Sequence, residues 1–470
     1  MRWRWGWTKR AEFGACCVLV TLGVSGCGDD TGGSDTQAAA TEGSAATSNA
    51  DGTAEGGTGL DPANGDRTVT VVSECAGQTV VVGINGGYVQ DCGADDSCPD
   101  GTTCLTSRNP PGCFWAFPEP SEGSPVLAEG DSVTYELTAP PIMQAITDGA
   151  AAGQTINVKW SGNLYASTRC ESDGSGCQTA MCSVSESGMT IVQPCDNGVG
   201  PQGPASLAEF TFSFDGSDFY DISIINGANI PISMGPDGGT PGGDDPYTCE
   251  TAGAATGSAS GLLGCSWSFD PQIEVAGMPT DQSTLLQAVA PGGASCTSNA
   301  DCGGGEVCGT AITFGGSTIE TVCGAPLGWW TADELCIYTA NAAGEPINCS
   351  QMVPSQGSVT ELYGCNGFNS NSCYNMGAAN PTCCGCPEWM IDGSTLPVPP
   401  GFTCWDTNPE WTSLAEPWAR FVKEACPTAY SFPFDDATST FTCATPEPST
   451  ENPNTMNYTI TLCPGGNDGL

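Results

Sequence analysis

The chain of 470 residues contains no histidine, and its 10 lysine and arginine residues stand against 53 aspartate and glutamate residues, for a formal net charge of -43. So few cations cannot neutralise a phosphate backbone or an anionic membrane surface, which excludes nucleic acid as a partner. Without histidine there is no Ser-His-Asp or Cys-His nucleophile and no His-ligated zinc. Any chemistry must come from carboxylates, hydroxyls, amides or thiols, and we expect no cofactor and no metal.

The N-terminal apolar stretch, residues 13–24, is about half the ~20 residues needed to span a bilayer. Four basic residues precede it, and small residues follow it directly before Cys27. This order predicts a signal peptide over residues 1–27 and lipidation of Cys27 in an exported lipoprotein, at the outer membrane or cell surface. The alternative is an ordinary signal peptide and a secreted product. A membrane is expected as a partner only through this anchor.

The remaining chain divides by composition into a tether and a body. Residues 28–66 are Gly, Ser, Thr, Ala and Asp with almost nothing apolar, a composition that cannot bury enough surface to fold. Length alone would allow three domains in all, but 64 Gly, 35 Pro and 29 Cys favour one loop-rich body, residues 67–470, stapled by disulfides.

Three of the 29 cysteines lie in residues 1–27, and the 26 others form an even set that predicts up to thirteen disulfides. Zinc is the alternative for the crowded Cys383, Cys384 and Cys386. Two segments share one spacing, with five residues between successive cysteines and a fourth cysteine beyond: Cys92, Cys98, Cys104 and Cys113, then Cys296, Cys302, Cys308 and Cys323. We expect two disulfide knots in loops. Calcium is the alternative for their acidic residues, but neither knot has the EF-hand pattern.

Short segments rich in Val, Ile, Thr and aromatic residues alternate with Gly, Pro, Asn and Asp, which predicts an all-β sandwich or barrel. The expected strands lie within residues 67–75, 78–86, 131–139, 154–160, 208–214, 220–225 and 457–463. Helical periodicity is rare. Its best example is residues 409–426, with Leu414, Trp418, Phe421 and Val422 near one face. Pro417 is expected to begin the second half of this helix.

Strand parity places two carboxylates on one kind of face. In residues 207–214 the even positions are apolar and face a core, so Glu209 points the other way. In residues 220–225 Ile222 and Ile224 pack inward, so Asp221 points outward. If the two strands are neighbours, Glu209 and Asp221 form a carboxylate pair of the kind that glycoside hydrolysis uses. The alternative is that these positions are polar only because they face solvent.

Longer stretches of the sequence resemble the thaumatin-like family of pathogenesis-related proteins. SLAEFTFSFDGSDFYDISIINGANIPISM at 206–234 resembles the family's central segment, CPTAYSFPFDDATSTFTC at 426–443 its C-terminal stretch, and NYTITLCP at 457–464 its closing strand. GCQTAMC at 176–182 is close to the family signature but has Ala180 and Met181 where Gly and Asp are usual. The resemblance covers most of the chain from Arg67 onward, with insertions.

The resemblance implies a flattened antiparallel β-sandwich (residues 67–248 and 444–470), a disulfide-rich lobe (249–443, with an insertion at about 279–358) and an acidic cleft between them. The Cys-rich knots would be additions to this fold. It also implies five disulfides, which join Cys75 to Cys463, Cys170 to Cys177, Cys182 to Cys195, Cys249 to Cys443 and Cys265 to Cys426. Pairings from Cys296 to Cys404 stay open.

The family's cleft often carries one Arg, one Glu and three Asp, and two of these positions depart here. Glu209 matches the Glu, Asp221 the first Asp, and Asp435 or Asp436 the last Asp. Asn226 stands at the second Asp and Asn163 at the Arg, with Lys159 or Arg169 as alternative cations. The resemblance therefore implies the family's cleft with a cation and an anion replaced by amides.

Three functions follow as hypotheses from this resemblance. The first is binding of polysaccharide of the β-1,3-glucan type, with Tyr220 as a stacking platform in the cleft and Tyr165, Trp267, Trp329 and Trp330 as further candidates. The alternative is that these aromatic residues pack in the core or against loops. The second is weak endo-β-1,3-glucanase activity, with Glu209 as general acid and Asp221 as general base; inversion needs carboxyls ~6.5 to 9.5 Å apart and retention ~5 to 5.5 Å. The third is a protein-binding inhibitor or structural surface module, which the scaffold permits.

Overall fold

The computed structural model describes most of the chain between Asp66 and Gly469. The described residues are 66–92, 98, 102–105, 111–115, 119–137, 159–186, 189–193, 195, 200–213, 216–273, 275, 281–312, 319–339, 347, 349–353, 357–365, 384, 387–402, 408–448 and 453–469. The predicted signal peptide with Cys27, and the predicted tether up to residue 65, lie outside them. Among the helices of these ranges, none is long and apolar enough to cross a membrane.

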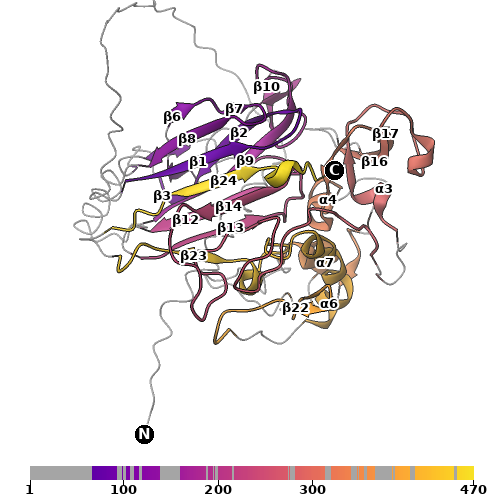
Figure 1. Ribbon diagram of the computed structural model, residues 1–470. Coiled ribbons are helices and arrows are strands. Elements are labelled where there is room, and N and C mark those ends of the chain that lie inside the picture. The colour runs from indigo at the N-terminus through magenta and orange to yellow at the C-terminus, as the bar shows by residue number, and fades with distance from the viewer. Residues whose placement is uncertain are drawn as a thin grey trace, which may run out of the picture.

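Two sheets form the sandwich (Figure 1). The first has the strand order β14-β24-β1-β8-β6: β14 (Ile232–Pro236), β24 (Tyr458–Leu462), β1 (Arg67–Ser73), β8 (Ser132–Leu137) and β6 (Pro120–Gly123). The second has the order β23-β13-β12-β9-β2-β7: β23 (Phe441–Cys443), β13 (Asp218–Ser223), β12 (Leu207–Ser213), β9 (Lys159–Cys170), β2 (Thr79–Gly86) and β7 (Val126–Leu127). Neighbours are antiparallel except β1 and β24, which are parallel.

Alternate side chains of both sheets build one core, because successive residues of a strand point to opposite faces. Phe210 and Phe212 of β12 stack with ring centroids 4.8 Å apart, and Trp160 of β9 stacks on Phe210 at 5.4 Å. Phe212 also stacks on Tyr458 of β24 at 5.0 Å, which joins the two sheets. The opposite face of β12 is therefore available for a site.

The other elements belong to loops and to the disulfide-rich lobe. The smaller sheets comprise β3 (Tyr88–Asp91), β4 (Thr102–Leu105) and β5 (Gly112–Trp115); β10 (Cys182–Glu186) and β11 (Met189–Gln193); β15 (Gln287–Val289), β16 (Val307–Ile312), β17 (Ile319–Gly324) and β18 (Pro326–Trp329); β19 (Met352–Val353) and β20 (Gly357–Ser358); and β21 (Met390–Ile391) and β22 (Ser394–Thr395). The helices are α3 (Ser283–Leu286), α4 (Ala332–Thr339), α5 (Val359–Tyr363), α6 (Pro409–Leu414) and α7 (Glu416–Ala425), with short 3₁₀ turns at Asn299–Asp301, Asp436–Thr438 and Pro464–Gly466. In Figure 1, α4, α6 and α7 gather beside one end of the sandwich, and β16, β17 and α3 project beyond them.

The architecture confirms the predicted all-β sandwich with a disulfide-rich lobe, and two elements differ from expectation. The strand expected within 154–160 is β9, which continues to Cys170; residues 154–158 lie outside the described residues. The helix expected over 409–426 is two helices, α6 and α7, with Ala415 between them and Pro417 in the first turn of α7. Proline fits there because a first-turn N–H has no partner within the helix.

Eleven disulfides join the described cysteines, and they include all five pairs that the resemblance implies. The two knots pair alike, first cysteine with third and second with fourth: Cys92–Cys104 and Cys98–Cys113, then Cys296–Cys308 and Cys302–Cys323. In each knot the third and fourth cysteines face each other on a hairpin, β4 with β5 and β16 with β17. The repeated spacing therefore encodes one small structural unit used twice.

Two further disulfides lie in the lobe, Cys336–Cys349 and Cys365–Cys384. Cys384 is therefore not a zinc ligand, which removes one of the three cysteines behind that alternative. The other two, Cys383 and Cys386, lie outside the described residues, as do Cys373 and Cys404. In the second knot the Asp301 carboxylate accepts hydrogen bonds from the backbone of Thr297 and Ser298, as turn residues do.

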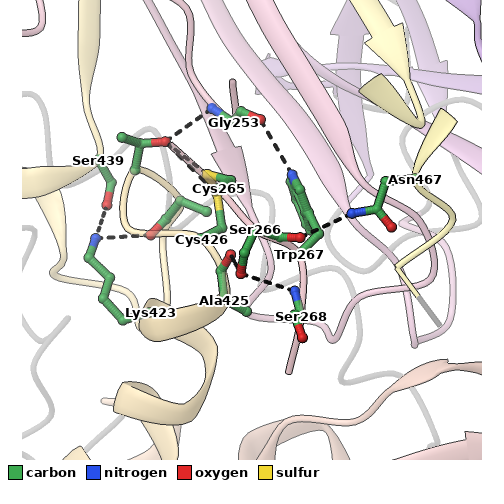
Figure 2. Close-up of a disulfide and its surroundings, with 12 residues drawn as sticks. Gly253, Cys265, Ser266, Trp267, Ser268, Lys423, Ala425, Cys426, Ser439 and Asn467 are labelled. Atoms are coloured by element: carbon green, nitrogen blue, oxygen red, sulfur yellow. Dashed lines mark hydrogen bonds between the residues drawn. A yellow bond between two sulfur atoms is a disulfide. The ribbon is translucent and has the colours of Figure 1, made fainter. Parts of the chain in front are cut away.

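The Cys265–Cys426 disulfide fastens the C-terminal end of α7 to the loop after β14 (Figure 2). Nearby, the Trp267 indole N–H donates to the carbonyl of Gly253 at 3.4 Å. Lys423, one turn before the disulfide, donates to the Ser439 hydroxyl at 2.8 Å. The disulfide thus fixes the helix end that carries Lys423, whose ammonium group donates to Asp435 at 2.9 Å.

Candidate functional site

Four polar side chains, which we call the polar row, lie side by side across the second sheet. Asn85 of β2 is opposite Asn163 of β9, Asn163 is opposite Glu209 of β12, and Glu209 is opposite Asp221 of β13. Directly opposed residues point to the same face with Cβ atoms about 4.5–5.5 Å apart. Three of the four are buried and Glu209 is half-buried, so the row lies on the face away from the sandwich core, beneath other parts of the protein. The two strands that carry Glu209 and Asp221 are therefore neighbours, which the parity argument set as its condition.

Glu209 and Asp221 share a hydrogen bond between their carboxyl groups. Burial raises the pKa of Glu209 to about 7, against the lowering effect of hydrogen bonds with Ser223 and Asp221. Burial, with repulsion from Glu209 and Asp436, raises the pKa of Asp221 well above its usual range. Two adjacent buried carboxyls cannot both ionise cheaply, so the pair holds a proton through neutral pH.

Of the two candidates for the last aspartate, Asp436 interacts with the polar row through Asp221, and Asp435 stabilises the fold. The Asp435 carboxylate accepts from Lys423 at 2.9 Å, from the Trp389 indole at 2.8 Å and from the Ser431 hydroxyl at 2.8 Å. Asp436 is half-buried, accepts from the Tyr430 hydroxyl at 2.9 Å and acts electrostatically on Asp221. Burial raises the pKa of Asp436 to about 6. Asp436 is therefore the third carboxyl of the site.

The ion pairs of the described residues all lie outside the polar row. They join Arg67 to Asp218, Arg420 to Glu416, and Lys423 to Asp435. Lys159 and Arg169 belong to β9, four residues before and six after Asn163, which is about 13 and 20 Å along an extended strand. Neither is next to Asn163 in the sheet register, so Glu209 has an amide as its neighbour where the resemblance implies a cation.

Asn226, the second departure, contacts an acid that the sequence did not single out. Its side-chain Nδ2 donates to Oε2 of Glu334 at 3.5 Å, and the Gly203 backbone N–H donates to Oε1 of the same carboxyl at 3.0 Å. Glu334 is 1% exposed and comes from α4, inside the insertion. Burial, with the neighbouring Asp333, raises the pKa of Glu334 to about 8. A carboxyl thus stands beside the position where an Asp was expected.

The prediction that aromatic side chains serve as stacking platforms is wrong for four of the five, because they are buried; the fifth, Trp329, is partly exposed. Tyr220 is fully buried and packs on Tyr458 and Phe441, because it shares the inward parity of Ile222. Tyr165, Trp267 and Trp330 are also buried. Trp329 is half-buried, but its ring stacks on Phe269 at 5.5 Å. Stacking on these rings is therefore not what this site offers to a ligand.

Sequence reasoning missed Asn85, a member of the polar row, and Glu334, the partner of Asn226. The pattern of β2 contained a signal for Asn85, since its alternation places Val80 and Val82 in the core and Asn85 on the other face. Glu334 carried no such signal, because its neighbours in space, Gly203 and Asn226, are more than a hundred residues away.

The fold and the site together define a disulfide-stapled β-sandwich protein in which one sheet supplies Glu209 and Asp221 and the lobe supplies Asp436 and Glu334. The family model described as the Thaumatin family matches residues 138–385 and 403–464, and the chain belongs to this family. The match extends through the insertion and includes the residues of the polar row other than Asn85.

Proteins similar to this chain include members of the family from three plants. The pathogenesis-related thaumatin-like protein 3.5 of Cryptomeria japonica is 26% identical over 376 residues, 78% of this chain and 92% of that protein. Thaumatin-like protein 2 of Prunus persica is 46% identical over 87 residues, 18% of this chain and 33% of that protein. A Prunus avium protein named glucan endo-1,3-beta-glucosidase is 43% identical over 99 residues, 20% of this chain and 35% of that protein. This chain matches only about a third of the length of these last two relatives.

Proposed function

We propose that this protein is exported, anchored through Cys27, and binds a neutral polysaccharide of the β-1,3-glucan type at the polar row and Asp436. The observation that carries the proposal is the row itself, in which two amides and two carboxyls follow one another across four adjacent strands. Oδ1 of Asn163 and Oδ1 of Asp221 are buried with no hydrogen-bond partner in the described part of the chain. Sugar hydroxyls would satisfy them, and unsatisfied buried acceptors are costly.

Charge favours a neutral glycan over an acidic one. The formal net charge of -43 repels polyanions, and the proton shared by Glu209 and Asp221 lets this pair both donate and accept without a counter-ion. The Prunus avium relative is named a glucan endo-1,3-beta-glucosidase, which supports β-1,3-glucan as the first polysaccharide to test.

A sedimentation assay tests this function. The purified protein is mixed with insoluble β-1,3-glucan, with cellulose and with an acidic polysaccharide, and its affinity for soluble laminarin is measured by calorimetry. We expect retention on β-1,3-glucan and none on the acidic polymer. Absence of binding to any glucan by protein with a native circular dichroism spectrum would refute the proposal, and capture of an exported protein instead would favour the protein-binding module.

A second candidate function, slow hydrolysis of the same glucan, is favoured by the state of Glu209. A carboxyl with a pKa of about 7 is suited to protonate a glycosidic oxygen. Asp221 is unsuited as the base, because its carboxyl is hydrogen-bonded to Glu209 and burial raises its pKa well above the usual range. We therefore assign the base to Asp436 in this candidate. Release of reducing ends from laminarin that Glu209→Gln abolishes without weakening sedimentation would support it, and no release would leave binding as the function.

The lipid anchor has its own test. Cys27→Ser in the full chain is expected to move the protein from the membrane fraction to the medium, because a thioether-linked lipid needs the cysteine sulfur. An unchanged distribution between the fractions would show that the segment acts as an ordinary signal peptide or in another way.

A further inference from the structure

The insertion is fastened to the chain segment that leaves β13. The backbone of Trp329, at the end of β18, pairs with Ala228 through two hydrogen bonds of 2.7 and 2.9 Å. The Thr331 hydroxyl donates to the carbonyl of Ile225 at 2.6 Å. Gly328 has φ +144°, and a Cβ there would lie 2.2 Å from the Ala228 carbonyl oxygen, so only glycine allows this approach. The first turn of α4 is thereby held against residues 225–228.

This contact brings the Glu334 carboxyl between two partners with different requirements. The Gly203 N–H can only donate, so Oε1 of Glu334 must accept from it. The Asn226 amide can present either its NH₂ group or its carbonyl oxygen to Oε2. Gly203 is needed for the arrangement, because a Cβ at this position would lie 2.4 Å from Oε1 of Glu334. The Glu334 carboxyl therefore has one partner that can only donate, Gly203, and one amide that can rotate, Asn226, with the Tyr338 hydroxyl as a third hydrogen-bonding group.

We propose that Glu334 is a positioning residue for the glucan site, and that its proton decides which end of the Asn226 amide faces the ligand. Ionised Glu334 accepts from Nδ2 of Asn226, which turns the Asn226 carbonyl oxygen outward as an acceptor. Protonated Glu334 donates its O–H to that carbonyl oxygen, which turns the NH₂ group outward as a donor. The proposal rests on the proposed function and adds Asn226, which is half-buried, to the residues that would contact glucan.

The groups around Glu334 raise the pKa of its carboxyl into a range that can be titrated while the protein is folded. On its own helix, Asp333 adds a negative charge and the Tyr338 hydroxyl lies beside the carboxyl. The helix packed against α4 is α5, which brings Glu361 toward Asp333. Burial and this acidic neighbourhood set the pKa of Glu334 at about 8. Asp333 also lines a cavity between α4 and α7, next to Ile225 and Ser431.

The first test needs no glucan. Protein labelled with ¹⁵N-asparagine is titrated from pH 6 to 10, and the Asn226 side-chain NH₂ resonances are assigned by their loss in Asn226→Asp. We expect these resonances to shift with a midpoint near pH 8 in the natural protein and to stay constant in the Glu334→Gln variant. In this variant the side-chain oxygen accepts from Gly203, so the side-chain NH₂ group can only donate to Asn226. Resonances of Asn226 that do not move between pH 6 and 10 in the natural protein would overturn the proposal.

The second test measures laminarin affinity as a ratio, natural protein over Glu334→Gln, so that titration of Glu209 cancels. The ratio should be near one at pH 6, where both side chains donate, and should differ from one by about two- to tenfold at pH 9.5. Glu320→Gln, an exposed acid on β17 of the same insertion, should give a ratio of one throughout. A ratio of one at pH 9.5 for Glu334→Gln would refute the role in binding. If the natural protein binds no laminarin, the proposed function fails while the resonance titration still decides the amide switch.

Discussion

Glu209 of β12 and Asp221 of β13 stand directly opposite each other and share one hydrogen bond between their carboxyl groups. This relationship follows from two neighbouring strands with the same parity, and it places two acids in a site where the neighbouring strand offers the amide of Asn163 rather than a cation. The pair therefore behaves as a hydrogen-bonding unit with one proton rather than as two negative charges.

The first prediction concerns stability against pH. Glu209, Asp333, Asp436 and Glu334 have folded-state pKa values of about 7, 7, 6 and 8, above their ordinary values. The folded protein thus binds more protons than the unfolded chain, so their contribution is present in full below about pH 4 and is lost as pH rises through 6 to 8. We expect unfolding free energy to fall by several kcal/mol between pH 5 and pH 9, measured by urea titration.

A double variant isolates this effect. Glu209→Gln with Glu334→Gln removes two of these four carboxyls, and the loss of stability between pH 5 and pH 9 should shrink accordingly. The exposed Glu320, replaced by Gln, should leave the loss unchanged. Equal unfolding free energies of the natural protein at the two pH values would contradict the burial of ionisable protons in this site.

The second prediction tests the polar row as the binding surface. Asn163→Ala removes the buried acceptor beside Glu209 and should weaken laminarin binding about three- to tenfold, the effect of about one lost hydrogen bond. Thr211→Ala is the matched control, because Thr211 lies on the same face of β12 but bonds to the Ser161 hydroxyl at 3.1 Å. Equal loss of affinity in both variants would mean that binding does not depend on the row.

Local periodicity was sufficient to predict the centre of the site. Residues along β12 and β13 alternate between core and opposite face, so Glu209 and Asp221 could be assigned from the sequence. The same rule places Tyr220 in the core, so the prediction that Tyr220 is a stacking platform is wrong because it did not apply strand parity. Asp435 and Asp436 could not be separated, because they begin a 3₁₀ turn in which no two-residue alternation applies.

The remaining site residues depend on arrangements that no local pattern encodes. The register of Asn85 against Asn163 follows an irregularity in β2 between Thr79 and Val81, which shifts the pairing with β9. Glu334 reaches Asn226 only because the backbone of the insertion pairs with Ala228. Both relationships are set by contacts between distant segments, so they emerge from the structure alone.

The third prediction concerns the buried ion pair between Arg67 and Asp218. Arg67 donates to Asp218 at 2.8 Å and to the Ser213 carbonyl at 3.0 Å, and both charged side chains are fully buried. Arg67→Met would leave Asp218 without its counter-ion, and we expect a loss of about 3–5 kcal/mol in unfolding free energy. The loss should be larger at pH 8 than at pH 5, since a protonated Asp218 needs no cation. Glu416→Gln, which breaks the partly exposed pair with Arg420, should cost less than about 1 kcal/mol.

The fourth prediction compares two disulfides that close loops of different length. Cys265–Cys426 links residues 161 apart and Cys296–Cys308 links residues 12 apart. The chain-entropy relation gives a loss of about 5 kcal/mol for replacing the first pair by alanine and about 3 kcal/mol for the second, measured by urea unfolding.

The first replacement should also weaken laminarin binding, because it frees the end of α7 that carries Lys423, the partner of Asp435 beside the site. The second should leave binding unchanged, since the knot is carried by β16 and β17, which project beyond the helices of the lobe (Figure 1). If both double variants bind laminarin equally well, the link between the disulfide in Figure 2 and the site is wrong.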